Sequence, residues 1–342
     1  MKKTLLPVLV ILLLAWLVLR PGLREGSLSS NPQRSTTRLV MGSLATITTW
    51  NVPDALERRA VAEAFAAMEE VDRQLSRHRP DSEVSRINQA PRNEAQALPP
   101  TLLEVLQAGL ALSEATSGRF HLGLEPLIRL WGFSAETPPT QPPPAETVAA
   151  WKQAWPGLDG LRLVREGETT RIILANDRVG LDLGGIGQGY GADRAAAVLR
   201  EAGVVNALID VSGDVRVLGS KGEFPWRVGI QNPRQPGGTV AVVGLRGDTA
   251  LVTSGDYEQF YLYNSRRYHH ILDPLTGEPA QSQLASVSIL APQAMLADAL
   301  STAFFVVGAQ AGQELLRRFP GVEALWVTTN GVIGATGGFP QP

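Results

Sequence analysis

The sequence contains no cysteine, only four histidines and almost no excess charge, with 31 basic against 33 acidic side chains in 342 residues. The lack of cysteine excludes disulfides, thiolate metal sites and a lipidated N-terminal cysteine. Four histidines make a zinc site improbable. A net charge of −2 supplies no field that would attract nucleic acid or anionic lipid. We therefore expect no nucleic-acid partner.

What is present is enough apolar sequence to fold. A hydrophobic content of 44% over this length can bury one large core or two moderate ones, and nothing in the composition indicates disorder.

The N-terminus reads as an export segment. Lys2 and Lys3 precede an apolar run, Thr4 to Leu19, which Arg20-Pro21-Gly22 ends. The run is slightly shorter than a membrane span of about 20 residues, and no clean Ala-x-Ala cleavage site follows it. We predict an uncleaved membrane anchor over residues 1–21, with a cleaved signal or a buried helix as alternatives. A polar tether would cover 22–35, and one domain 36–342.

The pattern beyond the tether predicts an α+β or mixed α/β fold. Alternation over 37–50 indicates a strand, and helical spacing indicates helices over 53–78 and 99–116. A proline-rich segment, 136–146, should be a surface loop. Later segments alternate between strands and helices, with several hairpins. The strands expected there are 161–166, 170–175, 179–183, 204–211, 226–231, 239–246 and 285–291, with a last one at 323–329, and the helices are 189–202, 293–307 and 310–319.

A glycine cluster, VGLDLGGIGQGYGAD over 179–193, is the most informative stretch. It satisfies the relaxed dinucleotide pattern as Gly187-x-Gly189-x-x-Ala192, but the neighbouring hairpins argue against successive βαβ units. The glycines would let a phosphate approach helix-start amides, and an exposed carbonyl could bind a hard metal ion. A purely structural turn remains the alternative.

A carboxylate and two hydroxyls share one helix face in LADALSTAFFVVG. Asp298, Ser301 and Thr302 stand at i, i+3 and i+4, and such oxygens suit magnesium. In the alternative, Asp298 only favours the helix start and Thr302 only bonds to its own helix.

Three further stretches with polar residues could contribute to a functional site. His269 and His270 precede an Asp273-Pro274 turn and could move protons, or one could face solvent while the other packs. The stretch 75–88 reads as a polar loop after a helix. In 117–133, Trp131 and Phe133 fit a core better than a ligand platform.

Together, in this order and spacing, these islands resemble the ApbE family, the FAD:protein FMN transferases. The resemblance runs from about Val40 to the terminal Gly337-Gly338-Phe339-Pro340. It rests on the Met41-Gly42 strand, DSEVSRIN, GRFHLGLEPLIRLWGF, LDLGGIGQGYGAD, SGDV, TSGDYE, YHHILDPLTGEP and ADALSTA. It implies a two-lobed fold with mixed, largely antiparallel sheets flanked by helices, behind an N-terminal membrane segment.

The resemblance also implies an activity. The FMN half of FAD would pass, with Mg²⁺, to a threonine or serine hydroxyl of a membrane-associated redox flavoprotein, releasing AMP. The enzyme would lie in the bacterial periplasm, anchored to the inner membrane. His270 and Asp298 would be catalytic, and the metal ligands would be Gly185, Asp298 and Thr302, with Ser301 close by. FAD contacts would come from Met41, His78, Arg119, Phe120, His121, Asp182, Gln188 and Leu272.

Three positions depart from the family pattern. Most members carry lysine where Gln188 stands, commonly aspartate at His121, and an aromatic residue at His78. Losing the lysine removes a charge-assisted contact near the phosphates. Gln188 and His121 keep open a non-catalytic flavin-binding protein. The same site could also belong to an FAD pyrophosphatase that releases FMN and AMP, and the relaxed glycine pattern alone would suit a nicotinamide-dependent oxidoreductase.

Overall fold

A computed structural model describes residues 32–340, apart from 136 and 138. Its centre is an eight-stranded sheet in the order β1-β2-β6-β7-β10-β15-β16-β17, in which every pair is antiparallel. These strands are β1 (Gln33–Val40), β2 (Ser43–Trp50), β6 (Ala207–Val211), β7 (Asp214–Leu218), β10 (Thr249–Gly255), β15 (Leu284–Ala291), β16 (Glu323–Thr328) and β17 (Ile333–Ala335). The predicted mixture of helices and antiparallel sheet is confirmed.

The predicted strand over 37–50 is a hairpin. β1 and β2 turn at Met41 and Gly42, whose φ angles of 55° and 72° are both positive. Two positive φ values are what a tight two-residue hairpin turn requires. β1 begins at Gln33, so the last residues assigned to the tether belong to the sheet.

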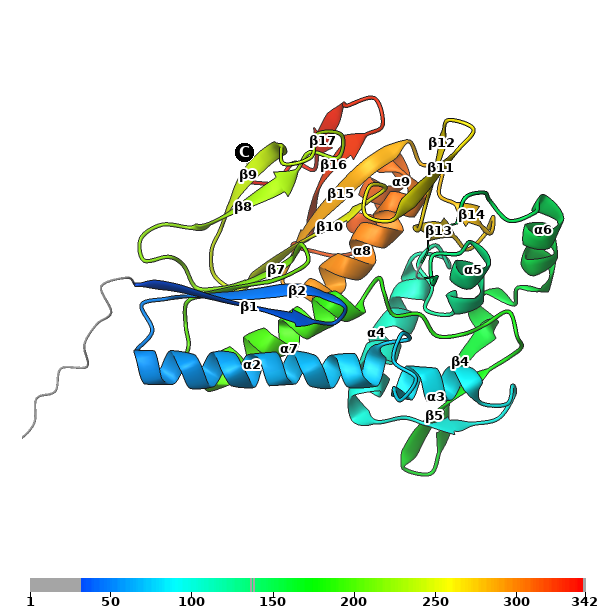
Figure 1. The fold of residues 1–342 in the computed structure, drawn as a ribbon, viewed down its shortest axis with the longest axis horizontal. Coiled ribbons are helices and arrows are strands. Elements are labelled where there is room, and N and C mark those ends of the chain that lie inside the picture. The colour runs from blue at the N-terminus through cyan, green and yellow to red at the C-terminus, as the bar shows by residue number, and fades with distance from the viewer. Residues whose placement is uncertain (1–31, 136, 138, 341–342) are drawn as a thin grey trace, which may run out of the picture.

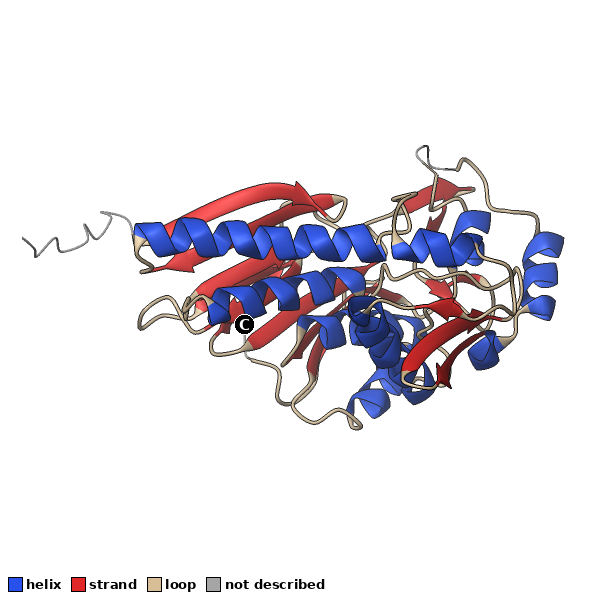
Figure 2. Cartoon of the chain, turned by 90° about the horizontal axis from the view of Figure 1, so that it is seen from below, coloured by secondary structure: helices blue, strands red, loops and turns tan. Residues whose placement is uncertain are grey.

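Helices cover one face of the sheet (Figure 2). They are α2 (Asp54–Leu75), α7 (Gly187–Glu201), α8 (Ala294–Val307) and α9 (Ala309–Leu316). α2 packs on α7, and α7 on α8. Apolar side chains three and four apart, such as Val61, Phe65 and Met68 on α2, are buried between helices and sheet. The predicted helices are confirmed here.

The other face of the sheet is covered by the hairpin of β8 (Trp226–Gln231) and β9 (Thr239–Leu245). A separate apolar cluster, including Val217, Trp226 and Val243, lies between hairpin and sheet. The middle of the sheet is therefore buried on both sides, which explains the almost wholly buried strands β7 and β15.

A smaller lobe lies beside the carboxyl end of α2 (Figure 1). It contains the sheet of β3 (Gln96–Ala97), β5 (Thr169–Leu174) and β4 (Leu161–Glu166), with α3 (Glu83–Gln89), α4 (Pro100–Ala115), α5 (Glu125–Leu130), α6 (Ala145–Ala154) and the short 3-10 turn Gly157–Gly160. Two small hairpins complete the fold: β11 (Phe260–Tyr263) with β12 (Arg266–His269), and β13 (Leu272–Asp273) with β14 (Glu278–Pro279).

Two local predictions were wrong. Residues 179–183 form no strand beyond a single bridge between Leu124 and Gly180, although their apolar side chains are buried as in one. The stretch 75–88, expected as a loop, contains most of α3, whose start is capped when the Ser82 hydroxyl accepts the Ser85 amide at 3.0 Å.

The expected anchor, 1–21, and most of the expected tether lie outside the described residues. Within 32–340, no helix has the length and apolar character needed to cross a membrane.

Candidate active site

The glycine cluster forms the turn that starts α7. The amides of Ile186 and Gly187 donate to the carbonyl of Leu183 at 3.2 and 2.7 Å, and the helix begins at Gly187 with no side-chain cap. The Gly189 amide on the first turn donates to the Asp298 carboxylate, and the positive end of the helix dipole favours an anion at this point.

The glycines themselves serve mainly to bring protein segments together. A Cβ on Gly189 would overlap the Ala294 carbonyl of α8, and one on Gly191 would overlap the Met41 sulfur. By contrast, the nearest atom to a Cβ on Gly187 would be 3.9 Å away. The expectation that the whole cluster leaves room for a phosphate is thus corrected. Helix packing needs Gly189 and Gly191, and only the turn around Gly185 to Gly187 faces the candidate site.

Two of the three polar residues predicted on α8, Asp298 and Thr302, point at this turn. The Asp298 carboxylate accepts the Gly189 amide at 3.2 Å, and the Thr302 hydroxyl would be 3.1 Å from a Cβ on Gly185. Ser301 is fully buried, donates to the Asp298 backbone carbonyl at 2.8 Å and meets the Ser254 hydroxyl at 2.7 Å. Asp298, Thr302 and Gly185 therefore lie together, and Ser254 connects Ser301 to this group because its hydroxyl also lies 3.3 Å from that of Thr302.

Asp298 has a second, unpredicted carboxyl beside it. Asp214, at the start of β7, is buried and hydrogen-bonds to Asp298. Burial raises the pKa of Asp298 to about 7, against the opposing effects of the Gly189 amide and Asp214. Burial, and then the charge of Asp298, raise the pKa of Asp214 well above its ordinary value. Because both pKa values are raised, the pair holds a proton at a higher pH than an isolated aspartate would.

These oxygens suit a hard cation. Among the described residues, no three histidine, aspartate or glutamate side chains gather as a metal cluster. The expected set contains only one carboxylate, with a hydroxyl and a backbone carbonyl, and Mg²⁺ commonly takes few protein ligands and keeps waters. The buried carboxylate of Asp298 beside the Thr302 hydroxyl and the Gly185 turn fits that pattern.

Asp182 connects the turn to two histidines. One of its oxygens accepts the Gly184 amide at 2.9 Å, and the other forms an ion pair with Arg77. Its negative charge acts to raise the pKa of both His78 and His270, although burial leaves both pKa values lowered. Asp182, His78 and His270 thus lie in one region, together with Arg77, which was not among the predicted residues.

His270 has a defined tautomer. The carbonyl of Gln259 accepts two hydrogen bonds from His270, one from the backbone amide at 3.0 Å and one from the ring Nδ1 at 3.2 Å. A carbonyl only accepts, so Nδ1 carries the hydrogen and Nε2 keeps its lone pair. With its pKa lowered by burial, the ring is neutral near pH 7 and able to take a proton.

The remaining predicted residues divide into two groups. Met41 and Phe120 lie next to the glycines, with Met41 against Gly191 and Phe120 against Gly185, and Gln188 is on the first turn of α7. Arg119, Leu272 and His121 are occupied elsewhere. Arg119 pairs with Asp273 at 2.6 Å, Leu272 is buried in an aromatic cluster, and His121 is buried against Trp155 with its Nδ1 accepting the Gly123 amide at 2.9 Å.

Asp193, a carboxylate that was not predicted as a site residue, stabilises the start of α8. Asp193, on α7, accepts the amides of Ala294 and Met295 at 3.0 and 2.9 Å, so it caps α8 from a neighbouring helix. The sequence signal was its place at the end of the glycine motif, but its partners lie about a hundred residues away.

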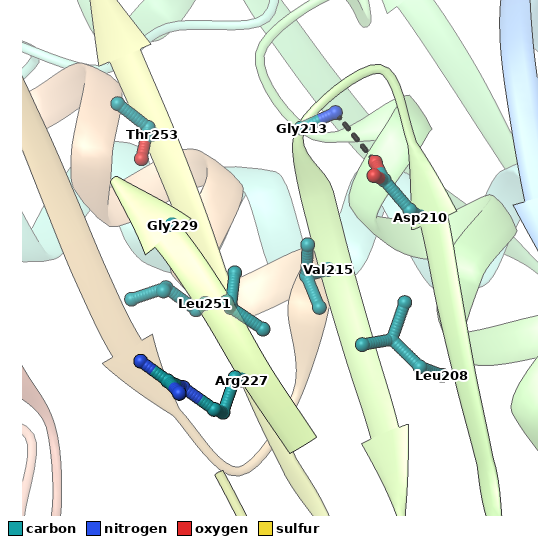
Figure 3. Close-up of a pocket in the computed structure, with 9 residues that line it drawn as sticks. Leu208, Asp210, Gly213, Val215, Arg227, Gly229, Leu251 and Thr253 are labelled. Atoms are coloured by element: carbon teal, nitrogen blue, oxygen red, sulfur yellow. Dashed lines mark hydrogen bonds between the residues drawn. The ribbon is translucent and has the colours of Figure 1, made fainter. Parts of the chain in front are cut away.

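A separate cavity of about 240 Å³ lies on the opposite face of the sheet, under the β8–β9 hairpin (Figure 3). Leu208, Val215 and Leu251 form its apolar wall, and Arg227 and Asp210 provide charge. No residue predicted for the flavin or metal site lines it.

Known proteins resemble this chain over most of its length. A protein of Haemophilus influenzae named FAD:protein FMN transferase is 33% identical over 268 residues, covering 77% of each chain. A protein of Treponema pallidum with the same name is 32% identical over 314 residues, covering 89% of this chain and 87% of the relative. The expected enzyme class, a transferase, is thereby confirmed.

The family follows from the sequence pattern itself. The ApbE family pattern matches residues 41–326, and the chain belongs to the ApbE family. The crystal structure of the ApbE protein from Thermotoga maritima superimposes with a TM-score of 0.80 at 30% identity, covering 91% of this chain and all of that one. The predicted resemblance is confirmed.

Proposed function

We propose that this protein is an Mg²⁺-dependent FAD:protein FMN transferase that moves the FMN half of FAD to a threonine or serine hydroxyl of a partner protein and releases AMP. The names of the relatives support the class of reaction. The observation that carries the proposal is the meeting of Asp298 and Thr302 with the amide-bearing turn at Gly185.

In this proposal the turn at Gly185 and the positive end of α7 bind the pyrophosphate, and Asp298, Thr302 and the Gly185 carbonyl hold the cation. A bound Mg²⁺ would neutralise phosphate charge and act as a Lewis acid. The flavin nucleotide would be contacted by Met41, His78, Arg119, Phe120, His121, Asp182, Gln188 and Leu272. Arg119 and His121 would have to leave their present partners to do so.

The transfer step needs a base, and His270 supplies one. Its Nε2 takes the proton of the acceptor hydroxyl while the oxygen attacks the phosphorus of the FMN half. The bond between that phosphorus and the bridging oxygen breaks, and AMP leaves with that oxygen. A new phosphoester joins FMN to the acceptor, and the proton then passes to solvent. General-base assistance of this kind contributes about 10²- to 10⁴-fold in rate.

We further propose that the acceptor is a membrane-associated redox flavoprotein, and that the enzyme is periplasmic and held at the inner membrane by residues 1–21. Support comes from the lysines and apolar run at the N-terminus.

The test is incubation of the purified protein with FAD, Mg²⁺ and solubilised membrane proteins, followed by mass spectrometry for an FMN increment on threonine or serine. The result expected is one or few labelled proteins, with an equal yield of AMP and none with Asp298→Ala. AMP and free FMN without any adduct would instead identify a pyrophosphatase. Flavin binding without AMP would identify a non-catalytic carrier.

A further inference from the structure

A second cavity, of about 440 Å³, lies beside the first residue of β1 and is named here the Gln33 cavity. Its walls include Gln33, Thr48 and Leu208 from the main sheet, and Lys221, Phe224 and Arg227 from the turn before β8 and the start of that strand. Because β1 begins here, the N-terminal part of the chain joins the fold at this cavity, at the end of the molecule away from the smaller lobe (Figure 1).

The wall formed by Lys221 and Phe224 is fixed beside Gln33. The Lys221 amide donates to the Phe224 carbonyl at 2.9 Å, and the Phe224 amide donates back to the Lys221 carbonyl at 3.3 Å. The Lys221 ammonium lies over the Trp50 ring, 5.3 Å from its centroid, and Trp50 is the partner of Gln33 in the β1–β2 ladder. The neighbouring Arg34 instead pairs with Asp54 of α2, so the cavity opens on the face of the sheet away from the helices.

The Gln33 cavity combines apolar surface with positive charge. Phe224 is 72% exposed, and of the described residues that line the cavity two, Lys221 and Arg227, are cationic and none is acidic. Within residues 32–340 neither cation has an ion-pair partner. Asp210 lies on the neighbouring strand, but it lines the other cavity, where it accepts the Gly213 amide at 2.8 Å.

A bilayer fits this combination because of where the chain enters the fold. If residues 1–21 are the membrane anchor, residues 22–32 can span at most about 40 Å, so the Gln33 cavity stays close to the lipid surface. Exposed aromatic side chains enter the boundary between headgroups and acyl chains, and basic side chains are attracted by anionic headgroups. The net charge of −2 gives the whole chain no such attraction, so it must be local.

We propose that the Gln33 cavity binds the headgroup of an anionic phospholipid, with Lys221 and Arg227 on the phosphate and Phe224 at the acyl boundary. This inference rests on the proposed membrane anchor and is independent of the transfer chemistry. The candidate active site, where Met41 packs on Gly191, then lies at the far end of the eight-residue strand β1, about 25 Å along the strand from the lipid contact.

The test uses the full chain in phospholipid nanodiscs. Because the sequence has no cysteine, Val205→Cys provides a single site for a fluorescent label. Val205 is 69% exposed, and its carbonyl lies 2.2 Å from the place of a Cβ on Gly219, just before the Lys221 turn. The matched label is Val332→Cys, 59% exposed beside β17 at the opposite edge of the sheet. Quenching by a headgroup-spin-labelled lipid reports contact in discs of phosphatidylcholine alone or with an equal part of phosphatidylglycerol.

The charge variant is Lys221→Gln with Arg227→Gln. Its control is Lys152→Gln with Arg178→Gln, which removes the same charge from exposed positions in the smaller lobe. We expect quenching at residue 205, but not at 332, in the discs that contain phosphatidylglycerol. Two basic side chains near an anionic bilayer shift the contact equilibrium about thirtyfold, so the charge variant should lose this quenching while the control keeps it.

Equal quenching at both labels, quenching independent of phosphatidylglycerol, or unchanged quenching in the charge variant overturns the lipid contact. A blue-shifted but unquenched label at residue 205 also overturns it, since protein and not lipid would then cover the cavity. A full chain that does not co-purify with discs of either composition refutes the anchor, and the contact with it. AMP release from FAD, measured on the same samples, tests the transferase separately.

Discussion

The buried guanidinium of Arg216 donates to the carboxylate of Asp193 at 2.9 Å, behind the start of α8. Replacing Asp193 with alanine leaves Arg216 and two α8 amides without that partner. Losing one member of a buried ion pair costs about 3–5 kcal/mol, so we expect a loss of that order in the free energy of unfolding, measured in urea.

The control is Asp248→Asn. Asp248 is the other ionic partner of Arg216, but its side chain is 57% exposed. Its loss should cost no more than about 1 kcal/mol. Equal losses in both variants would contradict the capping role of Asp193.

Gly189 and Gly187 should respond in opposite ways to alanine. At Gly189 the new Cβ overlaps the backbone of α8, and overpacking typically costs about 1–3 kcal/mol. At Gly187 the space is open, so stability should hold or rise. Thermal unfolding checks both, and FAD binding adds a second readout. A fall in FAD affinity in Gly187→Ala alone would show phosphate approach at this residue.

Gln188→Lys should strengthen FAD binding. A lysine on the first turn of α7 adds a charge-assisted contact to the pyrophosphate, and we expect a Kd lower by about three- to tenfold at low salt, with the gain shrinking as salt screens it. Glu201→Gln changes the net charge equally at the far end of α7 and should leave the Kd unchanged. Calorimetric titration distinguishes the two.

Acid should destabilise the protein through His269. Burial lowers its pKa to about 4 in the folded chain, from the ordinary 6.5. Between these values the unfolded chain binds the extra proton, so stability is present above pH 6.5 and is lost as the pH falls towards 4.

The amount of stability lost tests whether His269 is responsible. His269 contributes up to about 3 kcal/mol over this window, and His269→Gln should abolish its share while a donor to the Ala280 carbonyl is kept. Urea unfolding at pH 4.5 and 7.5 measures the difference. His78 gives the comparison, because its pKa is also lowered but its side chain is exposed, and His78→Gln should change the slope less than His269→Gln does.

The local sequence pattern was sufficient to predict the helices that bury one face against the sheet. The apolar spacing of α2 and the helix face carrying Asp298 and Thr302 are both set by neighbours three or four residues apart, and both were predicted.

Contacts between residues that are far apart in the sequence could not be predicted from that local pattern. Residues 179–183 look like a strand, yet Leu181 is held by the side chain of Asn88, and the Asp182 amide by the Leu122 carbonyl. The roles of Arg77, Asp193 and Asp214 likewise depend on partners that only the folded chain brings near. Helix α3 was missed for another reason. Its N-terminal capping residue, Ser82, is recognisable in the sequence, but the helix is short and polar.

The order of strands in the main sheet has a consequence for synthesis. β2 pairs with β6, and β10 with β7 and β15, so neighbours in the sheet are often far apart in the chain. The candidate site likewise spans Met41 in the first hairpin and Thr302 in α8. A growing chain therefore cannot assemble this site until α8 has been made, and contacts of such separation form slowly. Binding of FAD then stabilises only finished molecules, so the substrate favours completely folded enzyme over every partial form.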